Sequence, residues 1–210
     1  MKIGIIGSGH MGSALGRIWG RNGHDIMFSS RHPSELEGLA KSIGSNAGYG
    51  TPQEAARFGE VILLAVPWGQ AGDVLSSIVP LDGKILIDCT NPIKKDLSGL
   101  ELGQNTSAAE EAAKRALGAS VVKAFNTAFA DVMRSGSRVF EGHRATGFYC
   151  GDDQAAKAVV SKLIDETGLE PVDCGPLHSA RYLEPVTGLL LELAAKEGMG
   201  TNMAIALLRR

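Results

Sequence analysis

The 210-residue sequence has few cysteines and no long apolar run. Its three cysteines, Cys89, Cys150 and Cys174, form an odd set without CxxC or metal-ligand spacing, so we expect small buried side chains and no redox or metal site. No apolar stretch reaches the roughly eighteen residues that a membrane-spanning helix needs. The segment Ile3–Ile6 is too short for the apolar part of a signal peptide. These absences predict a soluble, cytoplasmic protein.

The sequence also lacks an excess of either basic or acidic side chains. The chain carries 21 lysines and arginines against 23 aspartates and glutamates, a formal net charge of −2. Binding to nucleic acid or to a membrane surface usually requires a basic excess, so we expect neither partner. The length allows one domain with a modest extension, and 44% apolar residues are enough for a proper core.

The most informative motif lies at the start of the chain. The apolar segment Ile3–Ile6 predicts a buried strand, and it is followed by Gly7-Ser8-Gly9-His10-Met11-Gly12 and an apolar stripe typical of a helix. In a dinucleotide-binding turn the first glycine allows the tight bend, the second lets backbone N–H groups approach a pyrophosphate, and the third lets helix and strand pack closely. We therefore predict that residues 7–12 bind a dinucleotide at the positive end of the helix. His10 is expected to be a solvent-facing spacer within this loop.

The end of the second predicted strand, residues 25–29, indicates which dinucleotide is bound. Enzymes that use NAD place an acidic residue there for the ribose hydroxyls. This chain has Ser29, Ser30 and Arg31, whose hydroxyl and guanidinium donors match a 2′-phosphate. We therefore predict NADP(H). The alternative is that Ser30 and Arg31 only cap the next helix on a solvated surface.

Alternating strands and helices predict a Rossmann-type α/β fold, a doubly wound parallel sheet with helices on both faces and a small C-terminal α/β extension. The apolar runs 61–66, 84–88 and 120–124 are expected to be strands four, five and six. Ligands bind outside the carboxyl ends of such strands. The loop residues expected to face the cofactor are Ala65, Val66 and Pro67, Thr90 and Asn91, and Phe125, Asn126 and Thr127. Turn formation alone would also explain Asp88 and Asn91.

The C-terminal part reads as a small second unit. Residues 128–143 predict a helical turn followed by a loop. Beyond them we expect a strand at 146–150, a helix at 153–166, a strand at 170–173 and a helix at 179–196 that is kinked or restarted at Pro185. We therefore predict an NADP-binding Rossmann domain over residues 1–144 and a lobe over residues 145–210 that completes the acceptor pocket.

A set of short motifs runs in order from end to end: Gly7-Ser-Gly-His-Met-Gly12, Ser29-Ser-Arg31, Ala65-Val-Pro-Trp68, Asp88-Cys-Thr-Asn-Pro92, Val122-Lys-Ala-Phe-Asn-Thr127, Cys150-Gly-Asp-Asp153, Cys174-Gly-Pro-Leu177 and Ala180-Arg-Tyr-Leu-Glu184. Together they resemble the NADPH-dependent F420 reductase family, the F420H2:NADP+ oxidoreductases. The resemblance implies that NADP(H) lies along the first six strands and that hydride passes directly to coenzyme F420, under a roof formed by the C-terminal lobe.

The same resemblance implies roles for individual residues. Ser30 and Arg31 would hold the 2′-phosphate, and Val66 and Pro67 would lie along the nicotinamide riboside. Ala124, Asn126 and Thr127 would lie near the nicotinamide and acceptor rings. Few catalytic side chains are expected, because both cofactors carry the chemistry and the protein supplies orientation.

The identity of the acceptor stays open at this stage. Archaeal members place a histidine where this chain has Asn126 and a serine where it has His178, whereas Phe-Asn-Thr resembles the NADPH-binding domains of six-transmembrane metalloreductases. The acceptor can therefore be F420, FMN, FAD or a ferric chelate, or the chain can be a non-catalytic NADP(H) sensor. His178 and Ser179 are candidates to orient an acceptor ring, and Arg181 to bind its tail. Alternatively, Ser179 caps the last helix and Arg181 pairs with Glu184 at i, i+3.

Two related enzyme classes fit less well. Pyrroline-5-carboxylate reductases and β-hydroxyacid dehydrogenases share this N-terminal half, but they need a large helical substrate domain, and only 66 residues follow Arg144. A lobe of this size would leave the apolar face of its last helix partly uncovered, so we predict a homodimer through that helix.

Overall fold

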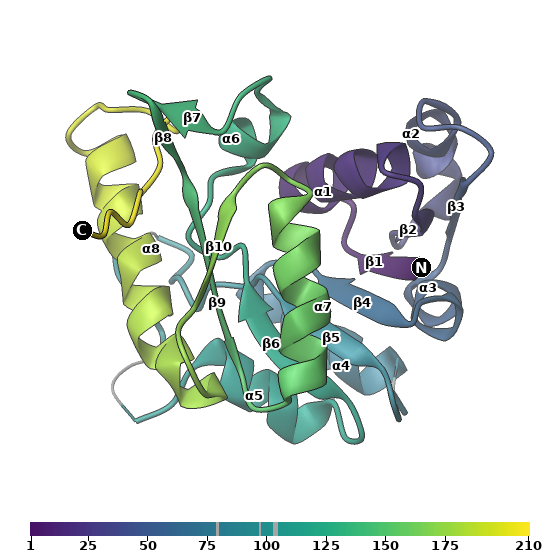
Figure 1. Ribbon diagram of the computed structural model, residues 1–210. Coiled ribbons are helices and arrows are strands. Elements are labelled where there is room, and N and C mark those ends of the chain that lie inside the picture. Colours follow the sequence, from purple (N-terminus) through teal and green to yellow (C-terminus); the bar gives the residue numbers. More distant parts are fainter. Residues whose placement is uncertain (79, 97, 103–104) are drawn as a thin grey trace.

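The computed structural model describes residues 1–78, 80–96, 98–102 and 105–210. Its centre is an eight-stranded sheet with the order β10-β9-β6-β5-β4-β1-β2-β3, beside a separate two-stranded hairpin of β7 and β8 (Figure 1). The strands are β1 Lys2–Ile6, β2 Asp25–Ser29, β3 Ala47–Gly50, β4 Val61–Leu64, β5 Ile85–Asp88, β6 Ser120–Ala124, β7 Val139–Phe140, β8 His143–Arg144, β9 Thr146–Gly151 and β10 Glu170–Asp173. The fold is the predicted Rossmann-type α/β sheet.

The strands of the sheet run in two directions. β1 to β6 are parallel to one another. β9 pairs with β6 in the antiparallel sense, with Ala124 opposite Tyr149, and β10 is parallel to β9. The two strands of the predicted C-terminal lobe therefore extend the sheet at the β6 edge, in the opposite direction.

Helices cover both faces of the sheet, and each face has its own apolar core. In β4, for example, Val61 and Leu63 point to one buried apolar cluster, and Ile62 and Leu64 to the other. A strand buried on both faces needs an uninterrupted apolar sequence, which β4 has. Residues of α1, α6 and α7 pack in the first cluster, and residues of α3, α4 and α5 in the second. The helices are α1 His10–Arg21, η1 Pro33–Leu36, α2 Glu37–Lys41, α3 Pro52–Phe58, α4 Trp68–Ile78, α5 Ala108–Arg115, α6 Ala130–Arg134, α7 Gln154–Asp165, η2 Leu177–Ser179 and α8 Ala180–Ala195.

Direct contacts join the N-terminal and C-terminal parts of the chain. The indole Nε1 of Trp19 in α1 donates to the carbonyl of Leu163 in α7 at 3.0 Å, and His24 lies 2.8 Å from a carboxylate oxygen of Glu166. Figure 1 shows the two termini on opposite sides of the molecule, with α8 on the side of the C-terminus. The predicted boundary after residue 144 falls between β8 and β9. The division into two units stays a prediction.

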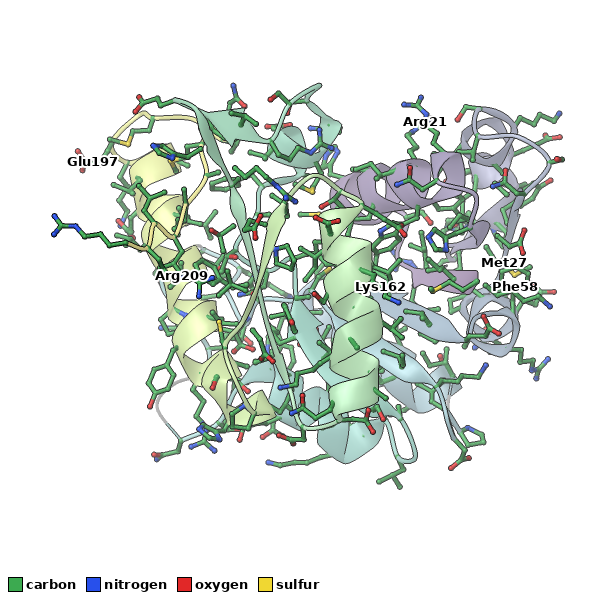
Figure 2. The ribbon with its side chains drawn as sticks, in the orientation of Figure 1. Arg21, Met27, Phe58, Lys162, Glu197 and Arg209 are labelled. Atoms are coloured by element: carbon green, nitrogen blue, oxygen red, sulfur yellow. The ribbon has the colours of Figure 1, made fainter. Side chains whose placement is uncertain are left out.

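The helical turn predicted after residue 128 is present as the short helix α6, but the loop predicted after it contains the β7–β8 hairpin, which the sequence pattern did not reveal. The last helix, predicted to be kinked or restarted at Pro185, is one continuous helix, α8, with Pro185 inside it, so the restart is excluded. No helix in the described part of the chain is long and apolar enough to cross a membrane. Charged side chains such as Arg21, Lys162 and Glu197 lie on the outer surface (Figure 2).

The three cysteines are free thiols. Cys150 is buried, and Cys89 and Cys174 are half-buried. Burial raises the pKa of Cys89 and of Cys150 to about 12, so both thiols are protonated at neutral pH. A protonated thiol is a poor nucleophile. The expectation of a buried side chain is confirmed for Cys150, and a packing role for the half-buried Cys89 and Cys174 stays a prediction.

Candidate dinucleotide and acceptor site

The glycine loop has the geometry that its sequence predicts. Gly7 has φ +96°, in the left-handed region that glycine tolerates. A Cβ on Gly12 would lie 2.1 Å from the Gly7 carbonyl oxygen, so only glycine lets α1 pack this closely on the loop. Gly9 is the N-cap of α1, and a Cβ there would meet nothing within 4 Å. Open space at the N-terminus of a twelve-residue helix is suited to a phosphate group.

A cavity of about 210 Å³ opens between this loop and the carboxyl ends of β2 and β4. Eight residues predicted to bind the cofactor line it: Gly7, Gly9, Ser29, Ser30, Arg31, Ala65, Val66 and Pro67. Arg31 is exposed, and among the described residues its guanidinium makes no hydrogen bond or ion pair. A free guanidinium at the end of β2 suits a 2′-phosphate, because a phosphate would be its first anionic partner.

The serines beside Arg31 have different surroundings. The buried hydroxyl of Ser29 donates to the Ile5 carbonyl at 2.7 Å and is therefore engaged in holding β2 to β1. Ser30 accepts a hydrogen bond from the backbone N–H of His32 at 3.0 Å, which leaves its hydroxyl hydrogen for a ligand. Of the two hydroxyls, only that of Ser30 is free to donate, so the phosphate contact stays a prediction for Ser30. Ser29 borders the cavity mainly as a structural residue.

The remaining residues of the loop lie around the start of α1 and do not line the cavity. Ser8 donates to the Ser29 carbonyl at 3.1 Å, and Met11 packs against the core. His10 is exposed, as expected of a spacer, and its Nδ1 lies 3.0 Å from a guanidinium nitrogen of Arg134. They can contribute backbone N–H groups to a pyrophosphate.

Four further lining residues were not predicted to bind the cofactor: Ile6 at the end of β1, Pro52, Gln70 and Val74. Pro52 is the first residue of α3, which opens with a capping box between Thr51 and Glu54. That capping box is visible in the sequence and marks the loop after β3, next to β2 in the sheet. The helix α4, which carries Gln70 and Val74, has no comparable signal in its first turn.

A second cavity, also about 210 Å³, lies at the carboxyl ends of β5 and β6. Three predicted residues, Asn91, Asn126 and Thr127, line it together with Thr187 and Leu190 of α8. In the sheet β5 separates β4 from β6, so the ends of β4 and β6 are about 10 Å apart at a strand spacing of about 4.8 Å. Both cavities therefore open at the same edge of the sheet, where ligands of this fold bind.

The backbone is strained next to this second cavity. Phe125, the residue between β6 and Asn126, has φ +63°, which is rare for a bulky side chain. Its ring is buried and packs edge-on against Trp19, with ring centroids 5.7 Å apart. Strain of this kind persists only where the surroundings enforce it, and it often occurs at binding sites. Here it turns the chain so that Asn126 reaches the cavity.

His178 does not join the other candidates. It is exposed in η2, after β10, and the hydrogen bond from Gly151 N–H to the Gly175 carbonyl places this turn at the end of β9. Because β9 is antiparallel to β6, that end lies at the sheet edge opposite Asn126. Ala124 is also outside both cavities, since its side chain is fully buried in the core.

The alternatives proposed for the start of α8 also need correction. Ser179 precedes the helix but makes no capping hydrogen bond with its side chain. Arg181 does not pair with Glu184. Its guanidinium instead contacts both carboxylate oxygens of Glu110 in α5 at 2.8 and 2.6 Å. Glu184 is buried and contacts Lys123, whose role the sequence pattern does not predict.

The glycine turn, the cavity and the free guanidinium define a dinucleotide-binding enzyme of the Rossmann class. Residues 2–92 match the family model described as NADP oxidoreductase coenzyme F420-dependent. The chain is 30% identical over 210 residues to the F420-dependent NADP reductase of Methanothermobacter thermautotrophicus, covering 92% of this chain and 89% of that protein. The chain belongs to the family of F420-dependent NADP reductases and is an NADP-dependent oxidoreductase.

Two other relatives complete the comparison. The chain is 35% identical over 190 residues to the metalloreductase STEAP3 of Rattus norvegicus, a match that covers 90% of this chain but only 37% of the longer rat protein. A crystal structure described as a putative F420-dependent NADP reductase from Arthrobacter sp. FB24 superposes with a TM-score of 0.85 at 24% identity, covering both chains fully. The structural match supports the fold. The resemblance inferred from the motifs is thus confirmed for both groups of relatives.

Replacing Arg31 with alanine is expected to weaken NADPH binding by about 1.5 to 3 kcal/mol, or roughly 10- to 150-fold, because hydrogen bonds to a charged phosphate are lost. NADH lacks that phosphate and should lose little. Titration calorimetry with both dinucleotides measures the difference. Arg21→Ala, at the exposed end of α1, serves as the control and should change neither affinity. A similar loss for NADH and NADPH would show that Arg31 does not contact the 2′-phosphate.

Proposed function

We propose that this enzyme transfers hydride between NADPH and a ring acceptor of the deazaflavin F420 or flavin type. NADPH binds in the cavity beside the glycine loop and supplies the hydride, and the acceptor binds in the second cavity. The family name supports F420, and the similarity to a metalloreductase supports a flavin. Reduction of a ferric chelate is the second candidate.

One observation carries the choice of a ring acceptor. The side-chain oxygen Oδ1 of Asn126 is buried and has no hydrogen-bond partner among the described residues. The orientation of the amide is fixed, because its nitrogen faces the oxygens of Asn91, Leu183 and Thr187 at 3.0 to 3.3 Å. A buried unpaired acceptor is costly unless a ligand supplies a donor. Flavins and deazaflavins carry a ring N–H that can do so.

The C-terminal residues contribute the other side of this cavity. Thr187, Leu190 and Leu191 of α8 line it opposite the loops after β5 and β6. This arrangement supports the proposal that residues 145–210 form a lobe that completes the acceptor pocket of the NADP-binding residues 1–144.

The proposal is tested by mixing the protein anaerobically with NADPH and one acceptor at a time: F420, FMN, FAD or a ferric chelate. We expect NADPH oxidation with F420 or a flavin, in equal molar amounts with acceptor reduction. Arg31→Ala should reduce the rate when NADPH is below saturation, which would show that turnover uses the predicted cavity. Turnover only with the ferric chelate would favour the second candidate. Tight NADPH binding without turnover of any acceptor would identify a sensor and contradict the proposal.

We also propose that the enzyme is a homodimer through α8. Two large apolar side chains on this helix, Tyr182 and Leu189, are 72% and 58% exposed. Their spacing of seven residues places both on the same face of the helix. Sedimentation equilibrium is expected to give twice the chain mass of 22.0 kDa, and Leu189→Glu should halve it by placing a charge in the interface.

Leu117→Glu is the matched control for the dimer. Leu117 is 71% exposed and follows the C-terminal end of α5, whereas α8 contacts residues 108–110 at the other end of α5, so its replacement should leave the dimer intact. A wild-type protein that sediments as a monomer at assay concentration would refute the dimer.

A further inference from the structure

A fully buried lysine lies at the centre of a network beneath the acceptor cavity. The ammonium group of Lys123, in β6, is 2.9 Å from Asp88 Oδ2 and 2.8 Å from Glu184 Oε1, and it donates to the Thr90 carbonyl at 2.6 Å. An ammonium group has three hydrogens, so these contacts use all of them. We call Asp88, Lys123 and Glu184 the buried triad. Its members come from β5, β6 and α8.

Both carboxylates of the buried triad have additional donors. Glu184 accepts hydrogen bonds from the backbone N–H groups of Ala108 and Ala109, at 2.9 and 3.2 Å, which are the first two residues of α5. Asp88 accepts one from the Thr90 N–H at 2.9 Å. The triad therefore fixes α8 to the N-terminus of α5 and also holds the loop that follows β5.

The electrostatics fit this arrangement. Burial alone would lower the pKa of Lys123, but the carboxylates of Asp88 and Glu184 outweigh it and leave the pKa raised, so the lysine is charged. Burial raises the pKa of Glu184, and Lys123 partly opposes this effect. A buried charged network of this kind adds little net stability compared with well-packed apolar residues. Its contribution is thus better sought in the geometry that it imposes.

Hydrogen bonds connect the segments that carry the buried triad to the residues that line the acceptor cavity. One helical turn beyond Glu184, the Thr187 hydroxyl donates to the Asn126 carbonyl at 2.8 Å. Asn126 in turn donates from its side chain to the Leu183 carbonyl at 3.0 Å. Asn91, which follows Thr90, donates to the same Asn126 carbonyl at 3.1 Å. Each polar residue that lines the cavity therefore lies within four positions in the sequence of a member of the triad.

We propose that Lys123 is a positioning residue for the electron acceptor: together with Asp88 and Glu184 it sets the register of α8 against β5 and β6, and thereby the shape of the acceptor cavity. It does not touch the acceptor itself. The dinucleotide cavity is built from other strands and other loops, so NADPH binding should not depend on the triad. This inference rests on the proposed function, since it assigns the second cavity to the acceptor.

The test replaces all three charges at once with Asp88→Asn, Lys123→Met and Glu184→Gln, which leaves no unpaired buried charge. We expect a cooperatively unfolding protein with an NADPH dissociation constant within twofold of wild type. The KM for the acceptor that the wild type reduces should rise at least tenfold, and fluorescence titration should show a matching loss of affinity for that oxidised acceptor. If the triple variant does not fold, Glu184→Gln alone keeps the Lys123–Asp88 pair and should shift the same two readouts.

Glu110→Gln is the matched control. It removes the ion pair with Arg181, a partly exposed contact that also joins α5 to α8, and it should leave the acceptor KM within twofold of wild type. A folded triad variant with unchanged acceptor KM and affinity would overturn the positioning role. Equal increases in the control and in the triad variants would do the same, because they would indicate general loosening of α8. Absence of turnover and of acceptor binding in the wild type would instead refute the proposed function.

Discussion

Replacing Gly12 with alanine is expected to lower NADPH affinity about a hundredfold, or about 2.8 kcal/mol. The added Cβ would lie 2.1 Å from the Gly7 carbonyl oxygen and 3.1 Å from the side chain of Ile5. Neither the backbone of the loop nor the packed strand beside it can move without shifting the N–H groups that are predicted to bind the pyrophosphate. The variant should also lose about 1 to 3 kcal/mol of stability from overpacking. Calorimetric titration and urea unfolding measure the two effects.

Variants at two other glycines distinguish an effect on NADPH affinity from an effect on stability. Gly9→Ala should leave the unfolding midpoint unchanged, because its Cβ meets nothing within 4 Å, yet it should weaken NADPH binding by filling the space at the start of α1. Gly38→Ala also meets no neighbour and lies in α2, so it should leave the NADPH affinity unchanged and, because alanine is favoured over glycine in a helix, raise the stability by about 0.5 to 1 kcal/mol. NADPH binding by Gly12→Ala at wild-type affinity would show that the pyrophosphate does not use this loop.

Replacing Lys123 with methionine is expected to destabilise the protein by about 3 to 5 kcal/mol. The change removes the cation that neutralises Asp88 and Glu184, which are both buried. Equilibrium unfolding in urea at pH 8 measures the loss. Lys114→Met is the control, because its ion pair with Glu111 lies on the surface and should contribute less than about 1 kcal/mol.

The loss in Lys123→Met should depend on pH in a defined direction. Burial already raises the pKa of Glu184, and removing Lys123 raises it further above its value in the unfolded chain. The folded variant then binds protons more tightly than the unfolded one, so its stability relative to wild type should recover as the pH falls from 8 to 5. A loss that is small, or that does not change with pH, would mean that the buried charges are not unpaired in the variant.

The parts of the fold that follow local rules were predictable from the sequence. The turn at residues 7–12 is specified by glycines with mechanical roles, and β4 by an apolar run that only a strand buried on both faces needs. The residues that follow β2, β4 and β6 could be assigned to one edge of the sheet, because the carboxyl ends of parallel strands lie there. That rule correctly brought Arg31, Val66 and Asn126 to the cavities.

The features that depend on long-range pairing were not predictable. Nothing in the alternation of residues 146–150 states whether the strand runs with or against β6, and this direction decides that His178 lies away from Asn126. Arg181 and Glu184 have the spacing of an i, i+3 pair, yet each has a partner on another element, Glu110 and Lys123 respectively. A lysine within an apolar strand sequence was the one available signal for the buried triad.

The most direct test of the account is calorimetric titration of the wild-type protein with NADPH and with NADH under the same conditions. Binding of NADPH at least tenfold tighter than binding of NADH is the predicted result, since the exposed guanidinium of Arg31 and the hydroxyl of Ser30 stand at the end of β2 where the 2′-phosphate would lie. Equal affinities for the two dinucleotides, or no binding of either, would contradict it.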